Sequence, residues 1–196
     1  MGVSMRLNHS ILAAVLSGAA TPVLAHTGTH SDPGFAAGFL HPLGGLDHML
    51  AMLGVGLFAA SLGRTALIAV PGSFVVMLTV GGAIGLSGFE IPAVEAAITA
   101  SVVALGAVVA LGRSWPVGAA AILVGFFALF HGYAHGSEIP SGATALPYSA
   151  GFALASAALH ALGLALSLVV LGHGKATRSL GAVITLAGFV LAFGSG

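Results

Sequence analysis

The chain contains no cysteine and very little charge. Five of its 196 residues are Lys or Arg and five are Asp or Glu, so charged residues make up 5% of the sequence. The lack of cysteine excludes disulfides, thiolate metal sites and cysteine nucleophiles. So few charges cannot cover a soluble domain of this size, and a formal net charge of +0 gives no indication of nucleic-acid binding. No GxxxxGK[ST] motif occurs, which excludes ATP hydrolysis by a Walker-type site.

Apolar residues and glycine dominate instead. Hydrophobic residues make up 58% of the chain, there are 30 glycines, and the mean hydropathy is +1.10. Apolar runs recur at about the 20-residue length with which a helix crosses roughly 30 Å of hydrocarbon. We therefore predict an all-α, polytopic membrane helix bundle of about six transmembrane helices. The predicted spans are residues 42–62, 66–86, 92–111, 116–133, 148–171 and 180–193.

Residues 1–25 are typical of a cleavable secretory signal peptide. A basic residue precedes a short apolar run, and Val23 and Ala25 lie at the positions that signal peptidase favours. The alternative is an uncleaved first transmembrane helix, but the run is short and Pro22 interrupts its end. Residues 26–196 contain no polar linker long enough to separate a second domain, so we expect a single six-helix transmembrane domain.

The remaining charges predict an orientation for these spans. If the mature N-terminus is periplasmic, alternate loops face the cytoplasm and contain all the remaining basic residues, which are Arg64, Arg113, Lys175 and Arg178. The outward loops contain Asp32, Glu90 and Glu138 and no Lys or Arg. This distribution matches the positive-inside rule and supports both the span count and a periplasmic N-terminus.

Ionisable side chains inside membrane spans are costly and usually face the bundle interior, so each is a functional candidate. The candidates are Asp47, His48, Glu95, His131 and His160 within spans, and His41, His135 and Glu138 at helix margins. At a rise of about 1.5 Å per residue, Asp47 and His48 lie roughly 9 Å below the outer start of their predicted helix, and Glu95 about 5 Å below its own. His131 lies one turn, about 6 Å, inside His135 at the margin of a third helix, so candidates from three helices occupy a similar outer layer. Imidazole with carboxylate is a ligand set for divalent cations.

Spacing along each helix restricts how these residues can cooperate. His131 and His135, at i and i+4, share a helix face and could chelate one ion. Asp47 projects about 100° from His48, so it could bind the ion directly or orient an imidazole. His160 stands alone near the middle of the fifth span, some 20 Å from its outer end, where it could be the next stop for an ion moving inward.

His41 and His48 pose a separate problem. They share a face, but seven residues of regular helix separate them by about 10 Å, which is too far for one ion with bonds of about 2.1 Å. Either Gly44 and Gly45 distort the helix, or His41 belongs to an entrance and His48 to the site. We favour the second interpretation, because Pro42 makes His41 a natural helix-edge residue.

Several candidates also have an ordinary structural explanation. Glu95 in a first helical turn is favoured by the helix dipole alone, and His160 could simply hydrogen-bond to a neighbouring helix. His135 and Glu138 could be loop residues. The mature start, residues 26–34, offers His26, His30 and Asp32 and could capture metal loosely, although two histidines in a loop are unremarkable.

Two segments resemble the HupE/UreJ family of bacterial nickel and cobalt permeases: HPLGGLDHMLAM from residue 41 and FHGYAHGSE ending at residue 138. With the signal peptide, the resemblance covers nearly the whole chain. By motif match it transfers His41, Asp47 and His48 from the first segment, and His131, His135 and Glu138 from the second. Glu95 and His160 rest on the depth argument. The better-known nickel/cobalt transporter family has four residues between its His and Asp-His, whereas five intervene here, so that family's site geometry is not transferred.

The resemblance implies secondary uptake of Ni²⁺, or of Co²⁺, from the periplasm across the bacterial inner membrane, supplying hydrogenase or urease maturation. Residues 26–196 would then be a permease domain, not an enzyme, with no catalytic cofactor and with the metal ion as cargo. Its partners would be the ion and the lipid bilayer, with nickel-enzyme maturation proteins acting indirectly and a homo-oligomer left open. Ligation requires a neutral imidazole, so a proton could exchange for the metal.

Two other functions fit parts of the sequence. In an intramembrane Zn²⁺-dependent hydrolase, three histidines would hold zinc, an acid would activate water, and Ser101 could assist. A metal sensor or membrane scaffold would bind metal without moving it. A hydrolase has no need of His160 deep in the bundle or of acidic outer loops, which favours transport. Ligand chemistry without thiolate favours Ni²⁺, Co²⁺ or Zn²⁺ over Cu⁺, but affinity order alone does not select nickel.

Overall fold

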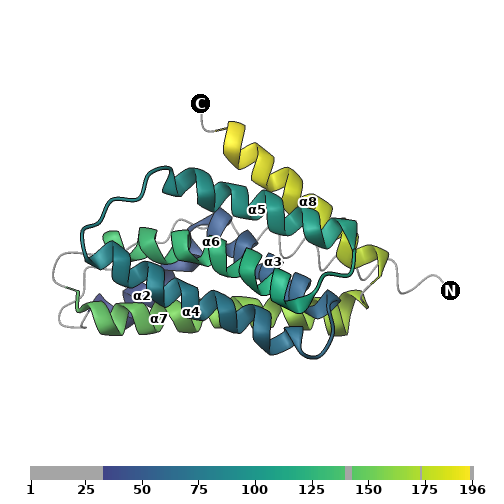
Figure 1. Ribbon diagram of the computed structural model, residues 1–196, viewed down its shortest axis with the longest axis horizontal. Helices are drawn as coiled ribbons and strands as arrows, with labels where there is room; N and C mark the ends of the chain where they lie inside the picture. The colour runs from purple at the N-terminus through teal and green to yellow at the C-terminus, as the bar shows by residue number, and fades with distance from the viewer. Residues whose placement is uncertain (1–32, 140–142, 173, 195–196) are drawn as a thin grey trace. The chain divides into compact units, whose positions relative to one another are not determined.

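The computed structural model describes residues 33–139, 143–172 and 174–194, and in these ranges the regular structure is entirely helical (Figure 1). The helices are α2 (Pro33–Gly44), α3 (Leu46–Ser61), α4 (Ala66–Leu86), α5 (Val94–Leu111), α6 (Val117–Ser137), α7 (Ala145–Ala165), the π-helical segment η1 (Leu166–Leu171) that continues α7, and α8 (Lys175–Phe193). The predicted signal peptide and the segment with His26 and His30 lie outside the described residues.

The predicted multi-pass membrane architecture is confirmed. Within the described ranges, five helices are long and apolar enough to cross a bilayer: α4, α5, α6, α7 with the start of η1, and α8. The pair α2 and α3 makes a sixth span if it is counted as one broken crossing. The chain is therefore a multi-pass, all-α membrane protein.

The first span differs from the continuous helix predicted for residues 42–62. It consists of α2 and α3, which meet at Gly45 with a bend of 85°. Pro42 lies inside α2 and not in a first turn, and it removes a backbone N–H donor near the end of that helix. Gly45 then adopts an extended conformation, with φ −107° and ψ 121°, as the residue before α3. Proline and glycine together end one helix and redirect the next.

The other boundaries lie close to the predicted ones. Pro116 immediately precedes α6, and Pro92 lies two residues before α5. Each proline therefore lies just outside the helix whose predicted span began with it. Pro71 lies inside α4.

Glycine allows close backbone contact between the helices. The α4–α6 contact is the most extensive in the described part of the chain, and α5 with α8 and α2 with α7 lie side by side on opposite sides of the bundle (Figure 1). A β-carbon would collide with the neighbouring helix at Gly81, Gly85, Gly132 and Gly136 between α4 and α6, at Gly106, Gly181 and Gly188 between α5 and α8, and at Gly38 and Gly151 between α2 and α7. Glycine at these positions therefore lets the helix backbones approach closely, as is typical of helix interfaces in membranes.

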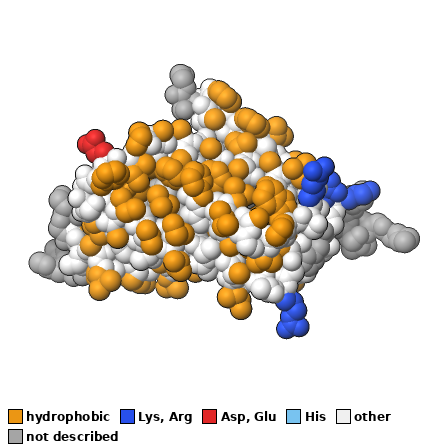
Figure 2. Space-filling model, viewed as in Figure 1, with side chains coloured by type: hydrophobic (Ala, Val, Ile, Leu, Met, Phe, Trp, Pro, Cys, Tyr) orange, Lys and Arg blue, Asp and Glu red, His pale blue; other side chains and the backbone are white. Residues whose placement is uncertain are grey.

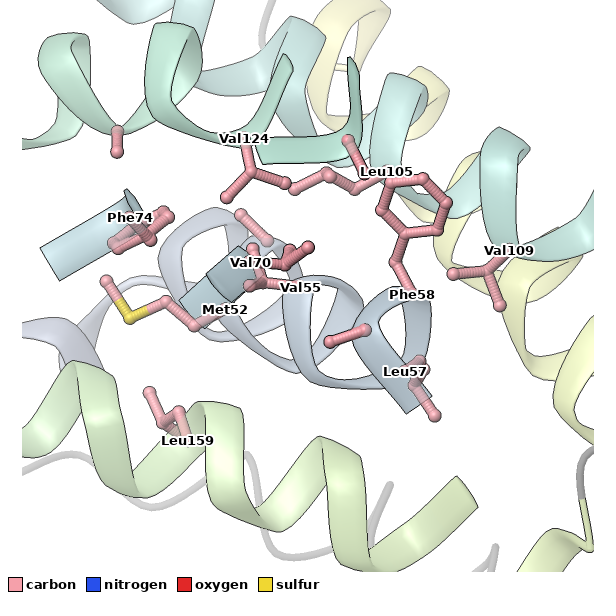
Figure 3. Close-up of a cluster of buried hydrophobic side chains, with 14 of the residues drawn as sticks. Met52, Val55, Leu57, Phe58, Val70, Phe74, Leu105, Val109, Val124 and Leu159 are labelled. Carbon is pink, nitrogen blue, oxygen red and sulfur yellow. The ribbon is translucent and has the colours of Figure 1, made fainter. Parts of the chain in front are cut away.

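Helix α3 is at the centre of the bundle. Nearly every residue from 51 to 60 is buried, and Figure 3 shows its Met52, Val55 and Phe58 surrounded by side chains from α4, α5, α6 and α7. A helix that is apolar on all sides is expected in such a central position. The N-terminus of α3, which carries Asp47 and His48, is thereby held among the other helices.

Charge is separated between the two ends of the bundle. Figure 2 shows Lys and Arg gathered at one end of the visible face, an acidic side chain at the other, and apolar side chains over most of the surface between them. Arg64 lies between α3 and α4 and Arg113 between α5 and α6, whereas Glu90 lies between α4 and α5. The alternation predicted from the loops is present, and the periplasmic assignment of the acidic end remains a prediction.

Candidate metal-binding site

The first turn of α3 orients one imidazole with a carboxylate. The Asp47 Oδ1 atom lies 2.8 Å from Nδ1 of His48 and accepts a second hydrogen bond, also of 2.8 Å, from the His48 backbone N–H. With Nδ1–H donating to the carboxylate, Nε2 of His48 retains its lone pair. This atom is buried and has no protein hydrogen-bond partner. Of the two roles open to Asp47, the geometry fits the orienting one.

Helix α6 contributes two buried imidazoles. His131 is 0% exposed, and its Nδ1 lies 3.0 Å from the Phe127 carbonyl oxygen, to which it can donate. Its Nε2 is thus left in the same state as that of His48, buried and without a protein partner. His135, one turn further on, is also buried, and neither of its ring nitrogens has a protein partner.

Three helices bring four imidazole rings together. The His48 ring centroid lies 5.0 Å from that of His131 and 4.6 Å from that of His135. The His41 ring, from α2, lies 4.6 Å from the same His135 ring. The bend at Gly45 makes this possible, so the distortion that the sequence left as the less favoured alternative is the one that occurs. The helix is therefore not regular between His41 and His48, and the role of His41 at an entrance stays a prediction.

The outer margin of this cluster has spacing close to that of a metal site. His41, His135 and Glu138 each offer one ligand atom, and these atoms all lie within 4.8 Å of one another. Two atoms that bind one ion at about 2.1 Å can be at most about 4.2 Å apart, so small adjustments would suffice. His41 and Glu138 are exposed, whereas His135 is buried. The three residues thus extend from the exposed surface to one of the buried rings.

The buried nitrogens without partners distinguish this region from ordinary core. Buried polar atoms in proteins are nearly always hydrogen-bonded, so unpaired ones require an explanation. In the described residues, the histidine nitrogens in this state are His48 Nε2, His131 Nε2, and both nitrogens of His135 and of His160. Lone pairs on neutral imidazoles are suitable ligands for a divalent transition-metal ion.

His160 lies apart from the cluster, on α7. It is 1% exposed, and its ring nitrogens have no protein partner, so the hydrogen-bond explanation for this residue finds no support. The Phe74 ring of α4 lies 4.7 Å from the His160 ring and 5.7 Å from the His131 ring. Phe74, which is fully buried, therefore contacts both histidines.

Two other sequence candidates lie elsewhere. Glu95 is exposed in the first turn of α5 and lines a groove with Thr99 and with residues of α8, including Phe189. No described contact links Glu95 to the imidazoles. Its depth along the helix predicted its layer in the membrane but not the side of the helix on which it lies. Ser101, considered for the hydrolase, donates its hydroxyl to the Ile98 carbonyl at 2.6 Å within α5.

The structural role of the glycines in the two segments HPLGGLDHMLAM and FHGYAHGSE was not predicted from the sequence. A β-carbon at Gly132 or Gly136 would overlap the backbone of α4, so these glycines place α6 where His131 and His135 can reach the other rings. A β-carbon at Gly45 would stand 2.8 Å from Asp47 Oδ1. The sequence did contain a sign of this role, because a glycine directly follows each histidine in FHGYAHG.

Comparison with known proteins adds two findings. The family model described as HupE / UreJ protein matches residues 13–191. Protein HupE of Rhizobium leguminosarum bv. viciae is 42% identical over 194 residues, which is 96% of this chain and 100% of that relative. No solved structure matches the chain.

Proposed function

Because the chain belongs to the HupE/UreJ family, which is associated with nickel and cobalt transport for hydrogenase and urease, we propose that it imports Ni²⁺ from the periplasm across the inner membrane. The observation that supports this most is the convergence of His41, His48, His131 and His135 from three helices. Members of this family are transporters rather than enzymes, and the proposed role of the ion is that of cargo.

The ligand chemistry suits a divalent ion in a membrane. Imidazole must be neutral to bind metal, so the four rings contribute no charge. Asp47 and Glu138, when ionised, contribute two negative charges beside the rings and balance those of the ion. An unbalanced double charge would be strongly disfavoured among apolar helices. Cobalt and zinc fit the same donor set, so the preference for nickel is part of the proposal.

The proposed route begins at the exposed residues and continues along the bundle. The ion first meets His41 and Glu138, passes to His135, and is then bound by His48 and His131. His160 is the next stop, about 18 Å along α7 from Tyr148 by helical rise. Phe74 contacts both His131 and His160, so its ring must shift for the ion to pass. Glu95, proposed for the path from its depth alone, lies in the groove beside α8 and not on this route.

Uptake without ATP requires a gradient to drive it. A membrane potential of 100 mV contributes about 2.3 kcal/mol for each charge moved, or about 4.6 kcal/mol for Ni²⁺. This free energy corresponds to accumulation on the order of 10³-fold. A potential that is negative inside is thus sufficient for scavenging nickel, with or without proton exchange at the histidines.

The test is uptake of radioactive nickel into proteoliposomes that carry the full chain and an imposed inside-negative potential. The wild type should accumulate nickel. His131→Ala should abolish uptake, and Asp47→Ala should lower nickel affinity by about 10- to 100-fold, as is typical of losing a partner that orients a ligand. Ser101→Ala is the matched control, because its hydroxyl bonds only within α5 in the described structure.

The outcomes separate the three functions. Nickel uptake by the wild type that is lost in His131→Ala and kept in Ser101→Ala supports the permease. Nickel binding without flux would replace it with the sensor or scaffold. Metal-dependent turnover of a lipid or peptide without flux, lost in Ser101→Ala, would replace it with the hydrolase.

A further inference from the structure

Tyr148, in the first turn of α7, has a buried hydroxyl that no protein group satisfies. Its side chain is 1% exposed, and the hydroxyl has no hydrogen-bond partner in the described structure. Buried tyrosines usually find such a partner. The chain has two tyrosines, and the other one, Tyr133, accepts a hydrogen bond of 3.1 Å from the Ile91 backbone N–H. The unpaired phenol therefore requires an explanation.

Its surroundings are those of the outer margin of the metal site. The Tyr148 ring lies 5.9 Å from the His41 ring. Tyr148 and His135 line the same cavity of about 280 Å³. Two residues of the outer margin, His41 and His135, are thus neighbours of this tyrosine, and Glu138 follows His135 by three residues.

Backbone packing fixes this arrangement. A β-carbon at Gly38 would overlap the Tyr148 carbonyl, and a β-carbon at Gly151 would overlap the carbonyl of Phe35, so α2 and α7 touch along their backbones. His41 follows Gly38 by three residues and lies on the same side of α2. The contact that holds α2 against α7 therefore also places the His41 ring beside Tyr148.

We infer that the Tyr148 hydroxyl is a positioning residue of the metal site, donating a hydrogen bond to an oxygen ligand of the ion. That ligand is the Glu138 carboxylate or a water molecule that the ion keeps when bound by His41 and His135. The inference rests on the proposed function and extends it to a residue outside both signatures. A phenol suits this task because it donates a hydrogen bond without adding charge beside the cation.

The same bond bears on which ion is preferred. Zn²⁺ is satisfied by four tetrahedral ligands, whereas tetragonal sites of nitrogen and oxygen ligands suit Ni²⁺. A hydrogen bond that holds an additional oxygen ligand in place therefore favours nickel over zinc. Loss of the hydroxyl should weaken nickel binding more than zinc binding, and a purely structural role of Tyr148 would not produce that difference.

The experiment compares Tyr148→Phe with Tyr133→Phe in the purified full-length chain, by calorimetric titration with NiCl₂ and with ZnCl₂. We expect Tyr148→Phe to weaken nickel binding about 10-fold, within the range for partners of metal ligands, and zinc binding by clearly less. Tyr133→Phe should leave both affinities near wild type. In a Glu138→Gln background, Tyr148→Phe should cost less nickel affinity than in the wild type, because the two residues act together.

Two results would overturn the inference while leaving the permease intact: Tyr148→Phe binding nickel like Tyr133→Phe, or losing nickel and zinc affinity by the same factor. Thermal unfolding of both variants establishes that each is folded when titrated. If the wild-type chain itself neither binds nor imports nickel, the proposed function and this inference are both wrong. The uptake assay thus distinguishes failure of the one from failure of the other.

Discussion

Replacing Gly132 by alanine should force α4 and α6 apart and disable ion binding while leaving every proposed ligand in the chain. A β-carbon at this position would overlap the Leu78 carbonyl oxygen and would stand 2.7 Å from the carbonyl carbon of that residue. Carbon atoms reach favourable contact at about 3.5 Å, so the helices must separate by roughly 0.8 Å at least. His131 precedes Gly132 directly and would move with α6.

The expected loss follows from how narrowly metal sites are defined. Ligand distances hold to within about 0.2 Å, so a helix shift of roughly 0.8 Å is several times the tolerance. We expect nickel affinity to fall at least about 10-fold, as when the support of a ligand is removed. Overpacking should also cost about 1–3 kcal/mol of stability, which for a chain of this length lowers Tm by about 2–12 °C.

The assay pairs calorimetric nickel titration with thermal unfolding of the purified chain. The matched control is Gly118→Ala on the same helix, where a β-carbon meets nothing within 4 Å. That variant should bind nickel like the wild type and unfold at or slightly above its temperature, since alanine favours helix over glycine. If Gly132→Ala binds nickel as well as Gly118→Ala does, the α4–α6 contact does not set the geometry of the site.

Two further predictions address the bend and the protonation of the rings. Gly45→Ala should lower nickel affinity about 10-fold, because its β-carbon would stand 2.8 Å from Asp47 Oδ1 and 2.9 Å from His48 Nδ1, whereas nothing lies within 4 Å of a β-carbon at Gly44. Equal titration curves for Gly44→Ala and Gly45→Ala would contradict this. Initial nickel uptake at fixed membrane potential should fall as the pH is lowered, because protons compete with the metal for neutral imidazoles. A rise on acidification would mean that protonation drives transport more than it blocks binding.

Composition was enough to predict the helical, multi-pass architecture, because few charges and long apolar runs leave no other stable arrangement in a membrane. Most helix ends lie close to the predicted ones, because they coincide with the ends of the apolar runs. The bend between α2 and α3 was not predicted, since its direction depends on packing against distant helices. Pro42 and Gly45 indicated a place where the helix could break. The close backbone contact of Gly38 with Tyr148 is one of the contacts that set the direction of α2.

The candidate site, too, was predicted only in part from the sequence. His131 and His135 were predicted to share a face from their spacing alone, and His48 was predicted to lie at their depth; the structure brings all three rings together. Depth placed Glu95 in the same layer, but rotation about the helix axis turns it toward α8. Tyr148 carried no signal, because an aromatic residue at the start of a span is ordinary in membrane proteins. Whether these residues bind metal stays a prediction.

If the chain is the proposed permease, the corner between α2 and α3 offers a way to release a bound ion by a small movement. His41 and His48 belong to two helices that meet at Gly45, and His41 lies four residues, or about 6 Å, from that glycine. A swing of roughly 10° would carry His41 about 1 Å, several times what a metal bond tolerates. Under the proposed function, a slight pivot of α2 would separate capture from release, provided that its backbone contact with α7 at Gly38 and Gly151 yields with it.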